Sequence, residues 1–263
     1  MKVAICLYGN LGNPQYASQR SGEDLMAESR NSNHFSTKSL VSLRKLFLEK
    51  YDTDIFIHSW SESEKETILS AYDPKLYVIE KQRPFDKTLE DYGMYGEDMS
   101  DWDISPSARI GYEFMFPSRK TVANLREEMT REVFRTNSRW YSTQQSIKLK
   151  EQYEKDNGFR YDLVLVTRFD NMFLRFPTLD SLPSLENFYA APRTGREDLD
   201  LAFYDYWFLS NSENMDKFGK LYDNITDYCI RPTFSCREHV EKFIGKEKIF
   251  TFGNHNTDYV LDK

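Results

Sequence analysis

The feature that most constrains the fold is a short apolar segment at residues 163–166, which gives way abruptly to the mostly polar segment Thr-Arg-Phe-Asp-Asn at 167–171. An unbroken run of Leu and Val predicts a strand covered on both faces, as in the centre of a parallel sheet. In open α/β sheets, ligands bind beyond the carboxyl ends of such strands. Arg168 and Asp170 would lie there on one side of an extended chain and could hold a phosphate and a divalent cation. The alternative is an ion pair that only caps the strand.

Strands and helices alternate along the first third of the chain. Apolar runs predict strands at residues 3–8, 54–60 and 76–80, and amphipathic periodicity predicts helices at 39–50 and 61–72. This order favours a mostly parallel sheet with right-handed crossovers, flanked by helices, in an α/β fold.

The remainder of the chain continues the pattern less regularly. A long polar loop is expected at residues 15–36, and a variable insertion rich in Pro and Gly at 83–118. Residues 121–154 read as helix, with a possible break at Asn137-Ser138. Further strands are expected at 187–191, 205–210 and 249–256, and further helices at 215–222 and 237–244. We expect one domain over residues 1–263, with a nucleotide-binding half to about 170 and an acceptor-side half from about 171.

Composition excludes some classes of function. The chain has 263 residues, 40% of them hydrophobic, which is enough for a sizeable core. Its net charge of −7 argues against a nucleic-acid partner, whose phosphates attract basic proteins. Three cysteines without metal-type spacing indicate a reducing compartment. No stretch is long enough to span a bilayer, so we expect a cytoplasmic protein, with peripheral membrane contact left open.

Polar and glycine-containing segments follow the other expected strands. Tyr8, Gly9, Asn10 and Leu11 form a strand end and loop that could approach a phosphate or base closely, although a plain turn is the alternative. The second strand ends in His58 and Trp60, which are candidates for binding a nucleotide at this strand end. His58 is favoured as a hydrogen-bonded structural histidine, and Trp60 would either stack on a base or cover the sheet.

Several motifs together resemble small glycosyltransferases of the GT-A fold, which make polysaccharides and glycans in bacteria and some large DNA viruses. The resemblance covers nearly the whole chain. It depends on the first strand with its Gly-Asn loop and on the segments DIFIHSW (54–60), YDPKLYVIE (72–80), SRWYSTQQ (138–145), YDLVLVTRFD (161–170) and DYWFLSNSENM (205–215).

The resemblance implies a nucleotide diphosphate sugar as donor, and usually Mn²⁺ or Mg²⁺. In such enzymes an Asp-x-Asp motif binds the metal, whereas here Arg168 replaces the first acid. One interpretation keeps Asp170 as a metal ligand with His255 as a second, which is favoured because a dication stabilises the leaving diphosphate. The other has Arg168 supply the positive charge, with weak metal dependence.

The resemblance also suggests roles for other residues. Asp205 is the candidate base for the acceptor hydroxyl, with Asp198 and Asp200 as alternatives and strand-end capping as the structural explanation. Residues 9–11, Trp60 and Glu80 would hold the nucleotide, and Tyr141 and Gln144 the donor sugar. The rival functions are a non-catalytic nucleotide- or glycan-binding module, and a hydrolase or phosphotransferase, for which neither G-x-S-x-G nor a P-loop is present.

Overall fold

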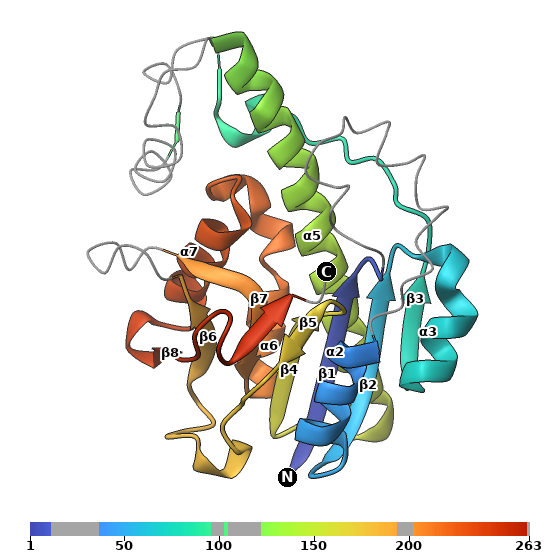
Figure 1. Cartoon of the computed structure of the whole chain (residues 1–263). Helices are drawn as coiled ribbons and strands as arrows, with labels where there is room; N and C mark the ends of the chain where they lie inside the picture. The colour runs from blue at the N-terminus through green and yellow to red at the C-terminus, as the bar shows by residue number, and fades with distance from the viewer. Residues whose placement is uncertain (12–36, 96–102, 105–121, 194–201, 262–263) are drawn as a thin grey trace.

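The computed structural model describes residues 1–11, 37–95, 103–104, 122–193 and 202–261, which form a layered α/β fold (Figure 1). In this part of the chain seven strands make one sheet in the order β3–β2–β1–β4–β7–β6–β8, and β5 and β9 make a small second sheet. The predicted α/β class with a mostly parallel sheet is confirmed. The expected loop at 15–36 and most of the insertion at 83–118 lie outside the described residues.

The described strands are β1 Lys2–Gly9, β2 Asp52–Ser59, β3 Leu76–Ile79, β4 Leu163–Arg168, β5 Asn171–Phe173, β6 Phe188–Pro192, β7 Phe203–Ser210, β8 Ile249–Thr251 and β9 Tyr259–Leu261. The α-helices are α2 Thr37–Leu43, α3 Lys65–Tyr72, α5 Val122–Asn157, α6 Ser212–Gly219 and α7 Pro232–Phe243. A π-helix, η2 Arg44–Leu48, continues α2. Short 3-10 helices are η3 Glu62–Glu64, η4 Glu90–Tyr92, η6 Leu179–Ser181, η7 Tyr222–Asp227 and η8 Lys246–Lys248.

Strand β1 lies at the centre of the parallel part of the sheet. It pairs in parallel with β2 on one side and with β4 on the other, so that Tyr8 has His58 and Arg168 as its two neighbours across the sheet. Strand β4 is covered on both faces as predicted, with residues 163–167 all buried. It is parallel only to β1, because β7 pairs with it in the antiparallel direction.

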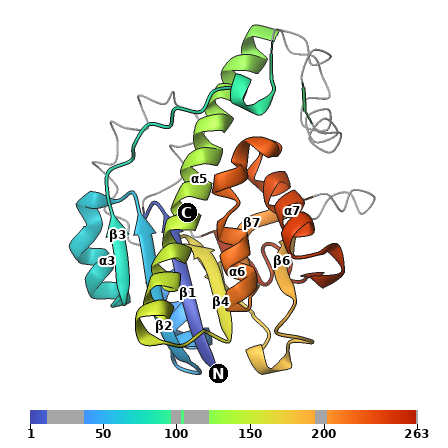
Figure 2. The same cartoon turned by 180° about the vertical axis from the view of Figure 1, so that it is seen from behind.

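Two apolar cores lie on the two faces of the sheet. Helices α5, α6 and α7 cover one face of the sheet, and Figure 2 shows this face turned toward the viewer. Helices α2 and α3 and the small β5–β9 sheet cover parts of the other face. Alternate residues of β1 serve the two cores: Ala4 and Cys6 face α5, whereas Ile5 and Leu7 face the side of α2.

Helix α5 is a single helix, and the predicted break at Asn137-Ser138 is wrong. The Asn137 side-chain nitrogen donates to the Val133 carbonyl (2.8 Å) and to the Tyr92 hydroxyl (2.9 Å), and neither bond interrupts the helix. With 36 residues α5 is about 54 Å long, roughly twice the length of the eight-residue β1. It therefore extends beyond the carboxyl ends of the strands (Figure 1).

Other boundaries differ from the sequence prediction for local reasons. Helix α7 begins at Pro232, five residues before the expected start, because proline is well tolerated in a first helical turn. Helix α6 begins at Ser212, because the Asn211 side chain accepts from the Asn214 amide (2.9 Å) and caps it. Strand β9 was not predicted. No helix in the described part of the chain is both long and apolar enough to cross a membrane.

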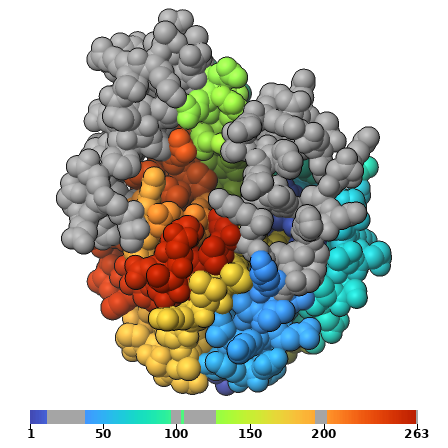
Figure 3. Space-filling view, in the orientation of Figure 1, coloured from blue at the N-terminus to red at the C-terminus, as the bar shows by residue number. Residues whose placement is uncertain are grey.

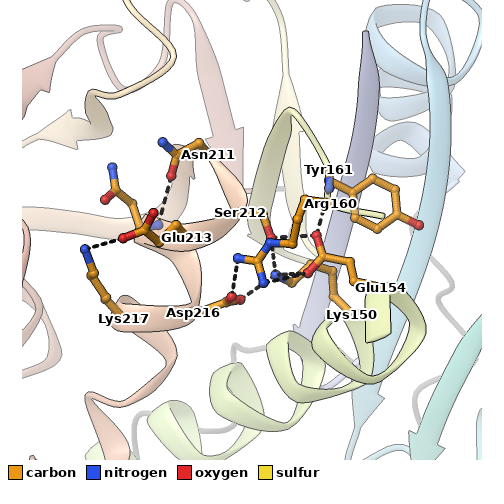
Figure 4. Close-up of polar contacts among 10 residues, drawn as sticks. Lys150, Glu154, Arg160, Tyr161, Asn211, Ser212, Glu213, Asp216 and Lys217 are labelled. Atoms are coloured by element: carbon orange, nitrogen blue, oxygen red, sulfur yellow. Dashed lines mark hydrogen bonds and ion pairs between the residues drawn. The ribbon is translucent and has the colours of Figure 1, made fainter. Parts of the chain in front are cut away.

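A buried ion cluster ties α5 to α6 and to the start of β4 at the amino end of the sheet (Figure 4). Lys150, which is fully buried, donates to Glu154 (2.9 Å) and Ser212 (2.5 Å) and pairs with Asp216. The Tyr161 amide donates to Glu154 (2.8 Å). Each buried charge therefore has several partners, which offsets its desolvation.

Replacing Lys150 with Met should lower the free energy of unfolding by about 3 kcal/mol, because two carboxylates lose their buried counter-charge. Urea denaturation measures this loss. Lys148→Met is the matched control: Lys148 lies on the same helix, is exposed and bonds only to Gln144 among its described contacts, so the change should stay within about 0.5 kcal/mol. Equal losses in the two variants would contradict a structural role for the cluster.

Candidate functional site

The carboxyl ends of β1 and β4 lie where the strand order of the sheet reverses: β2 and β3 follow on one side of β1, and β4 lies on its other side. The chain passes from β1 to β2 through α2 on one face, and from β3 to β4 through α5 on the other face. In open α/β sheets ligands bind at such a topological switch point. The described topology therefore independently selects the strand ends at Tyr8 and Arg168, which are paired residues.

Gly9 ends β1 in a conformation that other residues rarely adopt, with φ of +100°. Its amide donates to the Ser142 hydroxyl (2.9 Å), and its carbonyl accepts from the Trp60 amide (3.2 Å). A Cβ atom added to Gly9 would meet no heavy atom of the described residues within 4 Å. The turn is thus fixed by α5 and the end of β2, and the described residues leave space beside the Gly9 backbone. Asn10 is exposed and Leu11 is buried, its amide bonded to Ser61 (2.9 Å).

His58 is buried and has hydrogen-bond partners on both ring nitrogens. Nε2 lies 3.1 Å from Glu80, and Nδ1 lies 2.7 Å from the Ser142 hydroxyl. Glu80 accepts, so we assign the proton to Nε2, which leaves Nδ1 to accept from Ser142. Burial lowers the pKa of His58 to about 4, so the ring is neutral at pH 7. This is the structural histidine that the sequence favoured.

Trp60 covers the end of the sheet. Trp60 is 4% exposed, and its ring stacks on Tyr141 with the ring centroids 5.5 Å apart. The Arg83 guanidinium makes a cation–π contact with Tyr141, 3.9 Å from the ring centroid. A base could not stack on Trp60 without displacing Tyr141. Gln144 contacts the end of α6, donating to the Gly219 carbonyl (3.1 Å), so it faces away from the strand ends.

Arg168 and Asp170 form a two-pronged ion pair. Nε and Nη2 of Arg168 donate to the two carboxylate oxygens of Asp170 at 2.7 and 2.6 Å. Burial would lower the pKa of Arg168, but the Asp170 carboxylate outweighs it and raises this pKa above its usual range. The same-side geometry expected from the two-residue spacing is present. Nη1 of Arg168 takes no part in the pair.

A second ion pair lies beside the first. Nη1 of Arg139 is 3.2 Å from the Asp205 carboxylate, and Nη2 contacts the Tyr8 hydroxyl and the Asp205 carbonyl. The Tyr8 hydroxyl donates to the same carbonyl (3.0 Å), and burial raises its pKa, so it stays protonated. Two guanidinium groups, two carboxylates and a hydroxyl therefore meet at the switch point. The Asp205 side chain is still 18% exposed.

The described donors do not fit a divalent cation held by the protein. Both Asp170 oxygens already pair with Arg168, and His255 packs its ring on Tyr206 (5.5 Å), whose ring also lies 5.9 Å from the Arg168 guanidinium. Among the described residues no group of three or more His, Cys, Asp or Glu side chains could hold a metal. The geometry thus favours the interpretation in which Arg168 supplies the positive charge.

Two residues of the site were missed from the sequence. Arg139 and Ser142 lie three apart on the face of α5 that meets the strand ends, beside the predicted Tyr141. Their i, i+3 spacing in SRWYSTQQ was the available signal. Asp198 and Asp200 lie outside the described residues.

A comparison with known protein-family models finds no match for this sequence, and no curated protein matches it. The choice of function therefore depends on the geometry and chemistry of the site.

The neutral state of His58 predicts acid sensitivity. His58 takes up a proton near pH 6.5 in the unfolded chain but only near pH 4 in the folded protein. The contribution of neutral His58 to the free energy of unfolding is therefore complete above pH 6.5 and decreases as the pH falls toward 4. The slope approaches about 1.4 kcal/mol per pH unit. His58→Gln should be less stable than the parent at pH 7, and this difference should shrink by pH 4.5 in urea denaturation. Burial also lowers the pKa of His239 to about 4. Because the parent and the variant both contain His239, its effect cancels in the difference between them. A difference independent of pH would refute the assignment.

Proposed function

We propose that this protein is a glycosyltransferase of GT-A-like fold, which moves a sugar from a nucleotide diphosphate sugar to a hydroxyl group of a glycan. The observation that carries the proposal is the meeting of Arg168, Asp170, Arg139, Asp205 and Tyr8 at the switch point. The site combines cations suited to a diphosphate with a carboxylate that can accept a proton. The open backbone at Gly9 adds a place for close approach of the donor.

The two ion pairs have different roles in this proposal. Arg168 contacts the diphosphate through its Nη1 group, which takes no part in the ion pair with Asp170. The positive charge of Arg168 stabilises the leaving group. Arg139 is a positioning residue, because its described contacts hold Tyr8 and Asp205. Asp205 accepts the proton of the acceptor hydroxyl.

The chemistry then balances in one inverting step. The acceptor oxygen forms a bond to the anomeric carbon while the bond from that carbon to the diphosphate oxygen breaks. The electron pair of the broken bond stays on the diphosphate, beside Arg168, and the acceptor proton moves to Asp205. A divalent cation such as Mn²⁺ or Mg²⁺ would supply further positive charge when it arrives with the donor, and its contribution is part of the test below.

Binding of a nucleoside diphosphate should raise the melting temperature, because the ligand stabilises only the folded state. We expect such a shift with one member of a panel of UDP, GDP, ADP, CDP and TDP, each measured with Mn²⁺ and with EDTA. Arg168→Met should remove most of the shift. If the shift is equal in Mn²⁺ and EDTA, Arg168 supplies the charge; if it needs Mn²⁺ and is lost in Asp170→Ala, the metal interpretation holds.

Arg160→Met is the matched control for that experiment. Arg160 also pairs with an Asp, Asp216, but at the amino end of the sheet (2.5 Å). The variant should lose some stability and keep the full nucleotide-dependent shift. A panel without any shift in the parent protein would rule out the proposed donor class.

Asp205→Asn should reduce turnover by about 10²–10⁴-fold, because the acceptor hydroxyl loses its base. Nucleoside diphosphate release in the presence of donor and acceptor measures this rate. The nucleotide-dependent thermal shift should remain, since Asp205 does not contact the diphosphate in the proposal. Full activity of the variant would remove Asp205 from the mechanism, and binding without turnover in the parent would favour a non-catalytic binding module.

A further inference from the structure

A hollow of about 500 Å³ lies on the face of the sheet that α5 does not cover. Phe176 after β5 and the C-terminal segment with Phe250 and Phe252 line it, together with the deeply buried Trp207 and Tyr259. We call this hollow the aromatic groove. Figure 3 shows the segments that carry it, the yellow chain after β4 and the red C-terminal chain, side by side at the surface.

The aromatic groove combines ring faces with polar groups. Trp207 Nε1 and Tyr259 Oη are buried and have no hydrogen-bond partner among the described residues, although both side chains line the groove. An unpaired buried donor costs about 1–3 kcal/mol, so a nearby ligand acceptor would be stabilising. Arg175, Thr251 and Asp258 add hydrogen-bonding side chains to the lining.

These features match a sugar ring better than a purely apolar ligand. A pyranose has an apolar face of C–H groups, which packs on an aromatic ring, and a rim of hydroxyls that both donate and accept. An alkyl chain would leave Trp207 Nε1 and Tyr259 Oη without a hydrogen-bond partner. A pocket with mostly aromatic walls and a few polar groups is also the usual form of a small-ligand site.

Contacts between aromatic rings link the aromatic groove to the candidate site. The Tyr259 ring, which lines the groove, lies 5.8 Å from the Tyr206 ring, and the Tyr206 ring lies 5.9 Å from the Arg168 guanidinium. Tyr206 therefore lies between the groove and the switch point. We propose that the aromatic groove binds sugar residues of the acceptor glycan, an inference that rests on the proposed transferase function.

The test measures glycan binding without any donor. The full chain is mixed with p-nitrophenyl glycosides and disaccharides of glucose, galactose, N-acetylglucosamine, mannose and xylose, and saturation-transfer NMR identifies those that bind. Phe250→Ala and Phe252→Ala should each weaken binding by about three- to tenfold, the usual contribution of one ring contact. Phe243→Ala is the matched control, because Phe243 is 43% exposed at the end of α7, against 42% for Phe250, and should leave the affinity unchanged.

The outcomes separate this inference from the proposed function. If a nucleoside diphosphate stabilises the protein but no glycan binds, or if binding survives both groove variants, the groove assignment is overturned and the transferase proposal stands. If glycans bind in a groove-dependent way and no nucleotide binds, the site is a glycan site and the transferase proposal fails. Analytical ultracentrifugation completes the test: a dimer of the parent protein that Phe250→Ala dissociates would show that the groove is an interface between two copies and overturn the inference.

Discussion

The hydrogen bonding of one helix, α5, to both edges of the sheet is the constraint on which the rest of the structure depends. At the carboxyl edge Ser142 bonds Gly9 and His58, and at the amino edge Lys150 and Glu154 join the cluster with α6. Ser142 and Glu154 are twelve residues apart on α5, which is about 18 Å along the helix and close to the length of the strands it crosses. A shift of α5 by one turn would break both sets of bonds. The contacts of α5 at the two edges therefore fix the position of Arg139 relative to the strand ends.

The candidate site is electrically balanced before any ligand binds, which limits how a diphosphate can enter it. Arg168 with Asp170 and Arg139 with Asp205 are largely buried pairs, and separating either would leave an uncompensated charge in a poorly solvated place. A phosphate that contacts Arg168 without displacing Asp170 avoids this cost. Because the site has no net charge, it attracts a charged ligand only weakly. The site would therefore discriminate between ligands by whether their oxygens reach the N–H groups of Arg168 that do not bond to Asp170.

The strands that build the site were readable from the sequence because each is a short apolar run with a polar end, as in residues 163–171. The same-side placement of Arg168 and Asp170 followed from the strand geometry. What could not be read are contacts between distant segments. His58 finds its partners 22 and 84 residues away, and Arg139 is recognisable only once Asn137 is known to continue the helix. Strand β9 has three residues, too few for a periodicity, and is defined by its pairing with β5.

An irregularity between β6 and β7 explains how a single strand can serve both the candidate site and the aromatic groove. Ala190 pairs with Phe208 but Ala191 pairs with Tyr204, so β7 carries extra residues at this point. A bulge of this kind breaks the alternation of side chains. Asp205 faces Arg139 on the α5 side, and the alternation breaks at the next step, because both Tyr206 and Trp207 pack in the core of the opposite face. Without the bulge, neighbours on β7 would alternate between the faces, and the ring contacts that lead from Arg168 through Tyr206 to the groove would be interrupted. The bulge is therefore the local feature that brings the proposed base and the proposed glycan-binding surface to the same strand end.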